Sequence, residues 1–245
     1  MERASKEPAK KRISIIQSAY VPWKGFFDLI NRCDGYVIYD SVQFSKGHWH
    51  NRNRIKTPRG PTWITIPVVT AGRFGQRIQD VVIAKPWAEQ HWQALERSYR
   101  SAPFFPILSS IVRQWYESAS LENRLTAINE IFLRGIADLL KIHTKITRDE
   151  TYHPEGKGDD RVLDICLKAG ATNYLSGPSA RAYLDVEKFE RAGIVVEWMT
   201  YSDYPEYRQL WGSFEHRVSI LDLLFNVGAS PHNCARMISS STSGT

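Results

Sequence analysis

The run of histidine, asparagine and arginine side chains at positions 48–54 is the strongest candidate for chemistry. In an extended strand, successive side chains alternate between two faces. The alternation predicts His48, His50, Arg52 and Arg54 on one face, with Trp49, Asn51, Asn53 and Ile55 on the other. The first face is basic, so Arg52 and Arg54 are predicted to bind substrate phosphates. Aromatic and amide side chains on the second face are typical of a pocket wall.

The histidines and asparagines of this run suit proton transfer and oxyanion stabilisation. Histidine is the natural general base near neutral pH, so we predict catalytic roles for His48 and His50. We predict that the amides of Asn51 and Asn53 stabilise an oxyanion as it develops. The alternative is a solvated basic strand. No metal site is predicted, because the two histidines have no third or fourth ligand nearby in the sequence.

A second group of candidates follows the apolar run at residues 13–16. In open parallel sheets, ligands bind beyond the carboxyl ends of the strands, and the helix expected after this loop favours anions at its N-terminus. We therefore predict that Gln17, Tyr20 and Trp23 contact the substrate. The glycines of dinucleotide-binding and phosphate-binding loops are missing. The alternative is that Tyr20 and Trp23 fill the top of the core.

Two further strand ends carry polar residues that are predicted to lie on the same rim. Asp40 and Gln43 follow residues 36–39, and a carboxylate there can hold an amine or orient a base; the alternative for Asp40 is a turn. Ser176, Gly177 and Ser179 follow residues 173–175, where hydroxyls and free backbone amides can cradle an anion. The alternative for this loop is a connector that caps the next helix with a serine.

Alternating strands and helices must position these residues. Apolar runs predict strands at 13–16, 36–39, 173–175 and 194–198. Helical spacing and end signals predict helices over 25–33, 86–100, 104–117, 121–142, 159–169, 184–192 and 219–226. Residues 43–55 and 63–68 predict an extended, hairpin-like excursion. The fold class is therefore α/β, a three-layer Rossmann-like arrangement around a mostly parallel sheet, with a helical insertion at 86–142 and an N-terminal hairpin excursion.

The 245-residue chain, 42% hydrophobic and 24% charged, has the composition of a globular protein. We predict one α/β catalytic domain over residues 12–237, flanked by disordered tails at 1–11 and 238–245. Half of the net charge of +6 lies in residues 1–12, so the body is only mildly basic. Three widely spaced cysteines do not suggest a disulfide framework. Neither a signal peptide nor an apolar span is evident, which predicts a cytoplasmic protein without membrane association.

Six stretches, taken together and in order, resemble the WbqC-like family: residues 17–28, 40–44, 49–55, 63–68, 174–179 and 219–226. The segment from Asn51 to Arg54, in order with the others, is specific to this family. The chain departs from the family's pattern at Ser41, where a second aspartate is expected, and at Ala180, where glycine is expected. The resemblance implies a role in bacterial O-antigen and surface-polysaccharide synthesis, for which a glycine-transferase activity has been suggested.

Three functions are compatible with these residues. The first is a transferase that forms an amide between a glycyl-type aminoacyl group, or another acyl group, and an amino sugar, with Asp40 holding the amine. This reaction needs no intrinsic cofactor, but it needs an activated donor such as an aminoacyl-tRNA or a carrier-protein thioester. The second is a nucleotide-dependent transferase or ligase that acts on phosphates. The third is a non-catalytic subunit of a polysaccharide-synthesis complex.

Overall fold

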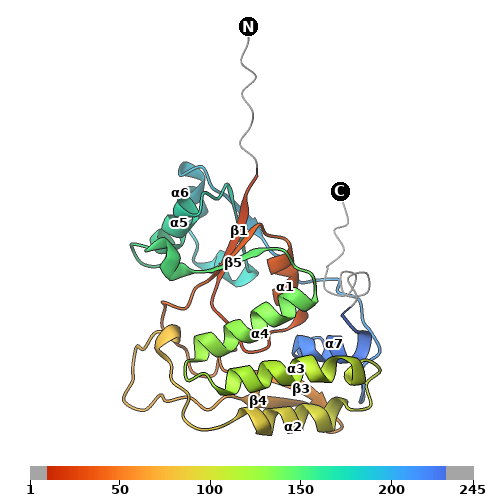
Figure 1. The fold of residues 1–245 in the computed structure, drawn as a ribbon. Helices are drawn as coiled ribbons and strands as arrows, with labels where there is room; N and C mark the ends of the chain where they lie inside the picture. Colours follow the sequence, from red (N-terminus) through yellow and green to blue (C-terminus); the bar gives the residue numbers. More distant parts are fainter. Residues whose placement is uncertain (1–9, 230–245) are drawn as a thin grey trace.

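The computed structural model describes residues 10–229 and is built around a parallel sheet (Figure 1). Its strands are β1 (Arg12–Ile16), β2 (Gly35–Ile38), β5 (Lys145–Arg148), β6 (Asn173–Ser176) and β7 (Val195–Trp198). The strand order is β5-β2-β1-β6-β7, and every neighbouring pair is parallel. Four of these strands were predicted. Strand β5 was not, because two of its four residues, Lys145 and Arg148, are charged and lie exposed at the sheet edge.

All the predicted helices are present, with ends that differ by a few residues. They are α1 (Lys24–Asn31), α2 (Ala88–Tyr99), α3 (Phe105–Ser120), α4 (Leu125–Leu139), α5 (Asp159–Lys168), α6 (Val186–Arg191) and α7 (Ile220–Val227). Short 3-10 helices cover Ile78–Asp80, Asp149–Tyr152 and Pro178–Ala182. Ser219 caps α7, since its hydroxyl accepts a hydrogen bond from the backbone N–H of Leu221 at 3.3 Å.

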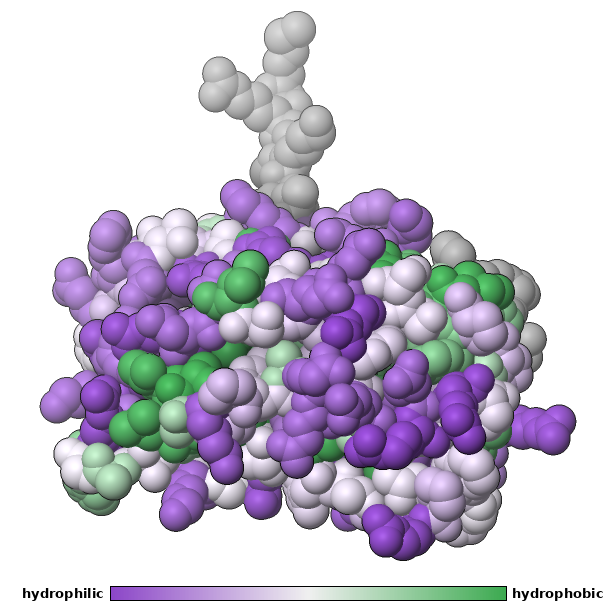
Figure 2. Space-filling view, turned by 60° about the horizontal axis from the view of Figure 1, so that its bottom comes forward, coloured by the Kyte–Doolittle hydropathy of each residue, from purple (hydrophilic) through white to green (hydrophobic). Residues whose placement is uncertain are grey.

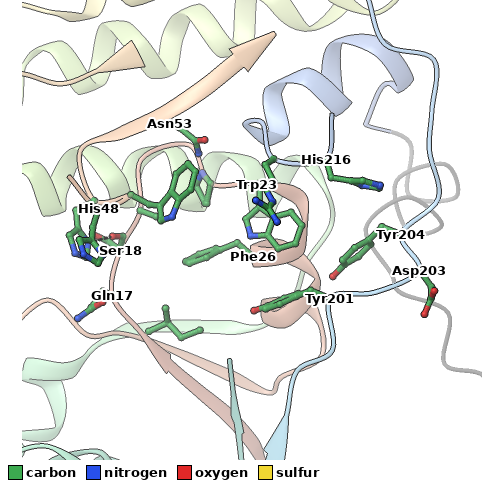
Figure 3. A pocket seen from close by; sticks show the side chains of 16 residues that line it. Gln17, Ser18, Trp23, Phe26, His48, Asn53, Tyr201, Asp203, Tyr204 and His216 are labelled. Atoms are coloured by element: carbon green, nitrogen blue, oxygen red, sulfur yellow. Dashed lines mark hydrogen bonds between the residues drawn. The ribbon is translucent and has the colours of Figure 1, made fainter. Parts of the chain in front are cut away.

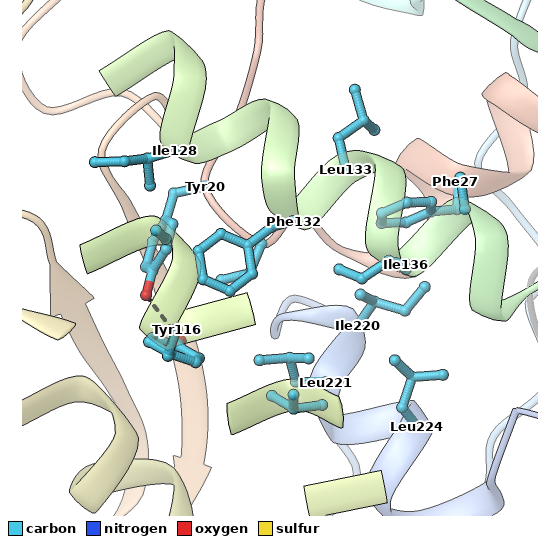
Figure 4. Packing of buried hydrophobic residues seen from close by; sticks show 14 of the residues in the cluster. Tyr20, Phe27, Tyr116, Ile128, Phe132, Leu133, Ile136, Ile220, Leu221 and Leu224 are labelled. Atoms are coloured by element: carbon cyan, nitrogen blue, oxygen red, sulfur yellow. Dashed lines mark hydrogen bonds between the residues drawn. The ribbon is translucent and has the colours of Figure 1, made fainter. Parts of the chain in front are cut away.

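The sheet separates two hydrophobic cores. In β1, Ile13 and Ile15 face the smaller core, which also contains Phe189 of α6. In β2, Tyr36 and Ile38 face the larger core. There α4 packs against α1 and α7 through Phe132, Leu133, Ile136, Phe27, Ile220, Leu221 and Leu224 (Figure 4). Helices α5 and α6 lie on one side of the sheet, with α1 and α4 on the other (Figure 1). The three-layer α/β fold is confirmed.

The helical insertion and the hairpin form the lower half of the molecule in Figure 1. Consecutive helices α2, α3 and α4 pack against one another. The antiparallel hairpin of β3 (Arg52–Thr57) and β4 (Gly60–Thr65) packs against α2 and α7. Figure 2 shows mostly hydrophilic side chains over the face that carries α2, with separate apolar patches. A hairpin-like excursion was predicted here, but its strands span Arg52–Thr57 and Gly60–Thr65 and not residues 43–55 and 63–68.

Residues 45–51 form turns rather than the predicted extended strand. Gly47 adopts φ of 86°, a left-handed conformation that an extended strand does not contain. The turns bring the carbonyl of Trp49 to 3.0 Å from the backbone N–H of Tyr20, which donates a hydrogen bond to it. Residues 45–51 therefore form a hydrogen bond to the loop after β1 and do not pair with a neighbouring strand.

Two predictions concern the N-terminal tail at residues 1–11 and the absence of a membrane span. Lys10 and Lys11, expected in the N-terminal tail, contact the sheet: Lys10 pairs with Glu197 at 2.8 Å, and the backbone N–H of Lys11 donates to Thr172 Oγ1 at 2.8 Å. Residues 1–9 and 230–245, which include the rest of both predicted tails and Cys234, lie outside the described residues. Between residues 10 and 229, no helix has the length and apolar character that crossing a membrane requires.

Candidate active site

A cavity of about 660 Å³ lies beyond the carboxyl end of β1 (Figure 3). Its walls come from three segments: the loop after β1 with the start of α1, the turns before β3, and the irregular segment after β7. The lining residues are Ile16, Gln17, Ser18, Ala19, Pro22, Trp23, Phe26, His48, Trp49, His50, Asn53, Tyr201, Asp203, Tyr204, His216 and Arg217. The position agrees with the rule that ligands bind beyond strand ends in parallel sheets.

Five predicted site residues line this cavity: Gln17, Trp23, His48, His50 and Asn53. Trp23 lies against Tyr201 and Tyr204, with ring centres 5.2 and 5.7 Å apart. Its ring also covers Gly25, where a Cβ atom would stand 2.4 Å from the indole. Any larger residue at position 25 would therefore displace Trp23 from the cavity wall.

His50 is held in one tautomer at the cavity wall. Its Nδ1 lies 3.1 Å from the carbonyl oxygen of Ser18, and a carbonyl can only accept, so the proton sits on Nδ1 and Nε2 carries the lone pair. The ring is 6% exposed and lies parallel to that of His48, with centres 6.0 Å apart. Burial lowers the pKa of His50 below its ordinary value of 6.5. His50 is therefore neutral at pH 7 and able to accept a proton.

The loop after β1, which carries Ser18, is held in place by hydrogen bonds with residues behind the cavity wall. Buried Asp40 accepts hydrogen bonds from the backbone N–H of Ser18 at 2.8 Å and from Thr126 Oγ1 at 2.5 Å. Asn129 of α4 donates to Ser18 Oγ and to the carbonyl of His50, both at 2.9 Å. Asp40 thus positions the loop and does not line the cavity. Asn129 was missed by sequence analysis, although a buried asparagine on an apolar helix face was a usable signal.

Asn51 and Asn53, the two predicted oxyanion donors, form hydrogen bonds to backbone carbonyls. Asn51 donates to the carbonyl of Ile66 at 2.8 Å and does not line the cavity. Asn53 donates to the carbonyls of Tyr20 at 3.1 Å and Val21 at 2.9 Å, which engages both of its N–H bonds. Val21 has φ of 36°, an unusual conformation for a β-branched residue. Asn53 therefore stabilises a strained loop, a different role from the one expected.

Tyr20 lies in the core behind the cavity. Its side chain is 0% exposed, and its hydroxyl bonds His91 Nδ1 at 2.9 Å and Tyr116 Oη at 2.8 Å. Its ring packs edge-on against Phe132 (Figure 4). Tyr20 therefore fills the core, as the alternative prediction had it. Its side chain does not line the cavity and cannot contact a ligand there.

The remaining predicted residues lie outside this cavity: Gln43, Arg52, Arg54, Ser176, Gly177 and Ser179. Gln43 and Ser179 are exposed, and buried Ser176 donates its hydroxyl proton to Tyr174 Oη at 3.3 Å. The predicted alternation of faces is wrong at Trp49. Because residues 45–51 turn, Trp49 lies 5.1 Å from Trp63, close to the arginines instead of opposite them.

The cavity wall that follows β7 was not predicted, since no helix or strand forms between residues 199 and 219. Beside this wall, Lys24 is 3% exposed; its Nζ donates to the carbonyl of Pro205 at 3.0 Å and lies 5.2 Å from the ring centres of Tyr204 and Tyr207. Burial lowers the pKa of Lys24 to about 8. His216 of the same wall has a buried Nδ1 without a partner among the described residues.

The two positions that depart from the family pattern are occupied in different ways. The Ser41 hydroxyl donates to the carboxylate of Asp149 and accepts from Arg161 Nη2 at 3.1 Å. Burial raises the pKa of Asp149, so a second carboxylate at position 41 would increase the repulsion there. Ala180 is buried in the loop after β6.

The two described cysteines, Cys33 and Cys166, are buried and form no disulfide. Burial raises the pKa values of Cys33 and Cys166 to about 12, which keeps both thiols protonated and unreactive at neutral pH. Between residues 10 and 229, no three His, Cys, Asp or Glu side chains gather as metal ligands.

Comparisons with known proteins agree with the resemblance seen in the sequence. The model of the WbqC-like protein family matches residues 17–233. A protein of Mycobacterium tuberculosis, described as uncharacterized, is 44% identical over 223 residues, which are 89% of this chain and 95% of the relative. No solved structure matches the chain.

Proposed function

The chain belongs to the WbqC-like protein family, and from this premise we propose that it is a transferase that joins an acyl group to an amine. The acyl group is of the aminoacyl, glycyl type, and the acceptor is a nucleotide-linked amino sugar used in O-antigen or other polysaccharide synthesis. The observation that carries the proposal is His50, a neutral histidine with a fixed tautomer in the wall of a cavity of about 660 Å³.

The cavity suits a sugar with an attached charged group. The rings of Trp23, Tyr201 and Tyr204 supply flat apolar surface on which a sugar ring can stack. Arg217 lines the same cavity and offers a cation to a phosphate. The unpartnered Nδ1 of His216 is a buried polar atom that a hydroxyl of the ligand can satisfy.

In the proposed reaction, the acceptor nitrogen attacks the acyl carbon of an ester or thioester. A C–N bond forms, the C–O or C–S bond of the donor breaks, and His50 Nε2 takes the proton from nitrogen. The same proton then passes to the departing oxygen or sulfur, so the enzyme ends unchanged. Gln17, whose exposed amide has no hydrogen bond to another described residue, is the side chain available to stabilise the oxyanion.

The substitution His50→Gln tests the base. Glutamine can still donate to the Ser18 carbonyl but cannot take up a proton, so transfer should fall about 10²- to 10⁴-fold while the acceptor still binds. Transfer by the wild-type protein should hold near neutral pH and decline only below pH 6.5, where His50 becomes protonated. The measurement is formation of the amide product by mass spectrometry, with a labelled acyl donor and nucleotide-linked amino sugars.

The control is His143→Gln, because His143 is exposed and does not line the cavity. A thermal-shift titration of the acceptor reports binding separately, since a ligand of the native state raises the melting temperature. Equal transfer by His50→Gln and His143→Gln would remove His50 from the mechanism. A shift with ATP alone, and none with any amino sugar, would favour a nucleotide-dependent ligase instead.

A further inference from the structure

Four side chains form a patch on and beside the β3–β4 hairpin, next to the cavity: Trp49, Arg52, Arg54 and Trp63, here called the Trp–Arg patch. Trp49 and Trp63 are 45% and 43% exposed, large fractions for apolar rings. The Arg52 guanidinium lies 4.1 Å from the ring centre of Trp63, and that of Arg54 lies 5.8 Å away. The patch thus combines aromatic faces with two cations.

The positive charges of the Trp–Arg patch are largely unpaired within the described residues. Arg52 forms no ion pair there, and Arg54 has only Glu215 at 3.7 Å. The Nε atoms of both arginines are buried and lack hydrogen-bond partners among the described residues. A buried donor without a partner is costly, and a phosphate oxygen would satisfy it.

The patch is continuous with the cavity, because Trp49 belongs to both. A molecule held on the patch can therefore place one end beside His50, which lines the same cavity. The tryptophans can stack with planar rings, and the arginines can pair with phosphates that join such rings. Stacked bases on a charged backbone are the combination that single-stranded nucleic acid offers.

We propose that the Trp–Arg patch binds the unpaired 3′ end of an RNA that carries the acyl group as a ribose ester. This inference rests on the proposed function and names its donor. Paired bases hide their faces, so a duplex fits the patch poorly, and a deoxyribose end lacks the 2′-hydroxyl that RNA offers. With only two arginines, binding is weak and sensitive to salt, which agrees with the mildly basic body of the chain.

Fluorescence anisotropy with a 5′-labelled single-stranded RNA of about 12 nucleotides tests the proposal on the full-length chain. Trp63→Ala should weaken binding about 5- to 150-fold, the equivalent of losing one stacked base. Arg52→Gln should reduce the slope of log affinity against log salt by about 0.7, the value for one phosphate contact on a single strand. Phe74→Ala, which removes a fully exposed ring elsewhere, should change neither.

Each outcome decides the matter. Equal affinity for the single strand and for a hairpin RNA without an unpaired end would overturn the proposal, as would unchanged binding in both Trp63→Ala and Arg52→Gln. The Arg52→Gln result stands even if Trp63→Ala fails to fold. Absent RNA binding, together with a thermal shift from the amino sugar, would refute the RNA donor and leave the proposed transferase with a carrier-protein thioester.

Discussion

Replacing Lys24 by methionine should change how the stability of the protein depends on pH. Burial lowers the pKa of Lys24 from 10.5 to about 8. At roughly 1.36 kcal/mol per pKa unit, the charged side chain costs the folded state about 3 kcal/mol at neutral pH. The unfolded chain keeps this proton up to a higher pH than the folded chain does. The penalty is therefore complete below pH 8, and stability rises as pH increases from 8 towards 10.5.

The Lys24→Met variant has a chain of similar length and no charge, so the penalty disappears. The difference in unfolding free energy between variant and wild type should shift by about 2 kcal/mol between pH 7 and pH 9.5, because wild-type Lys24 loses its proton over that interval. Urea titrations at both pH values measure it. Buried tyrosines and cysteines titrate alike in both proteins and cancel in the difference.

Lys85→Met is the matched control for this experiment, since the Lys85 side chain is exposed to solvent. Its stability difference from wild type should stay constant over the same interval. A constant difference for Lys24→Met as well would refute the reasoning, because it would mean that the folded protein leaves the ammonium group in a water-like environment.

Two further substitutions test the frame of the site. Asn53→Ala leaves the carbonyls of Tyr20 and Val21 without their hydrogen-bond donor. Urea unfolding should therefore show that the unfolding free energy falls by about 2–4 kcal/mol, and the acceptor should bind more weakly. Unchanged stability would contradict the anchoring role of Asn53. Tyr20→Phe leaves His91 and Tyr116 without their shared partner and should cost about 1–3 kcal/mol, with acceptor affinity retained in a thermal-shift titration. Lost affinity with intact stability would instead place Tyr20 in the site.

The central strands could be predicted because burial on both faces of a parallel sheet requires apolar runs. Residues 13–16 and 36–39 are such runs, and the cavity beyond β1 follows from the position of the strand end. Strand β5 lacked this signal because an edge strand is buried less, and charged Lys145 and Arg148 are tolerated there. Patterning therefore identified the centre of the sheet better than its edge.

Part of the site was predicted, from a strand end and from the run of polar residues at 48–54. Gln17 follows β1 directly and Trp23 immediately precedes α1, so the strand–loop–helix pattern placed both on the rim. Tyr204 and His216 lie in an irregular segment, which has no periodicity to read. The positions of His50 and Trp49 relative to each other depended on a turn at Gly47 that breaks the strand alternation. Contacts that form only through tertiary folding cannot be predicted from the spacing of residues along the chain.

The walls of the cavity come from segments that lie far apart in the sequence. One is made by residues 16–53, and the other by residues 201–217. During synthesis, the first wall leaves the ribosome long before the second has been translated. The rings of Trp23 and Phe26 thus face an open surface until Tyr201 and Tyr204 arrive. Substrate can be captured only after residues 201–217 have folded against residues 16–53, so binding at this cavity reports that two segments far apart in the sequence have come together.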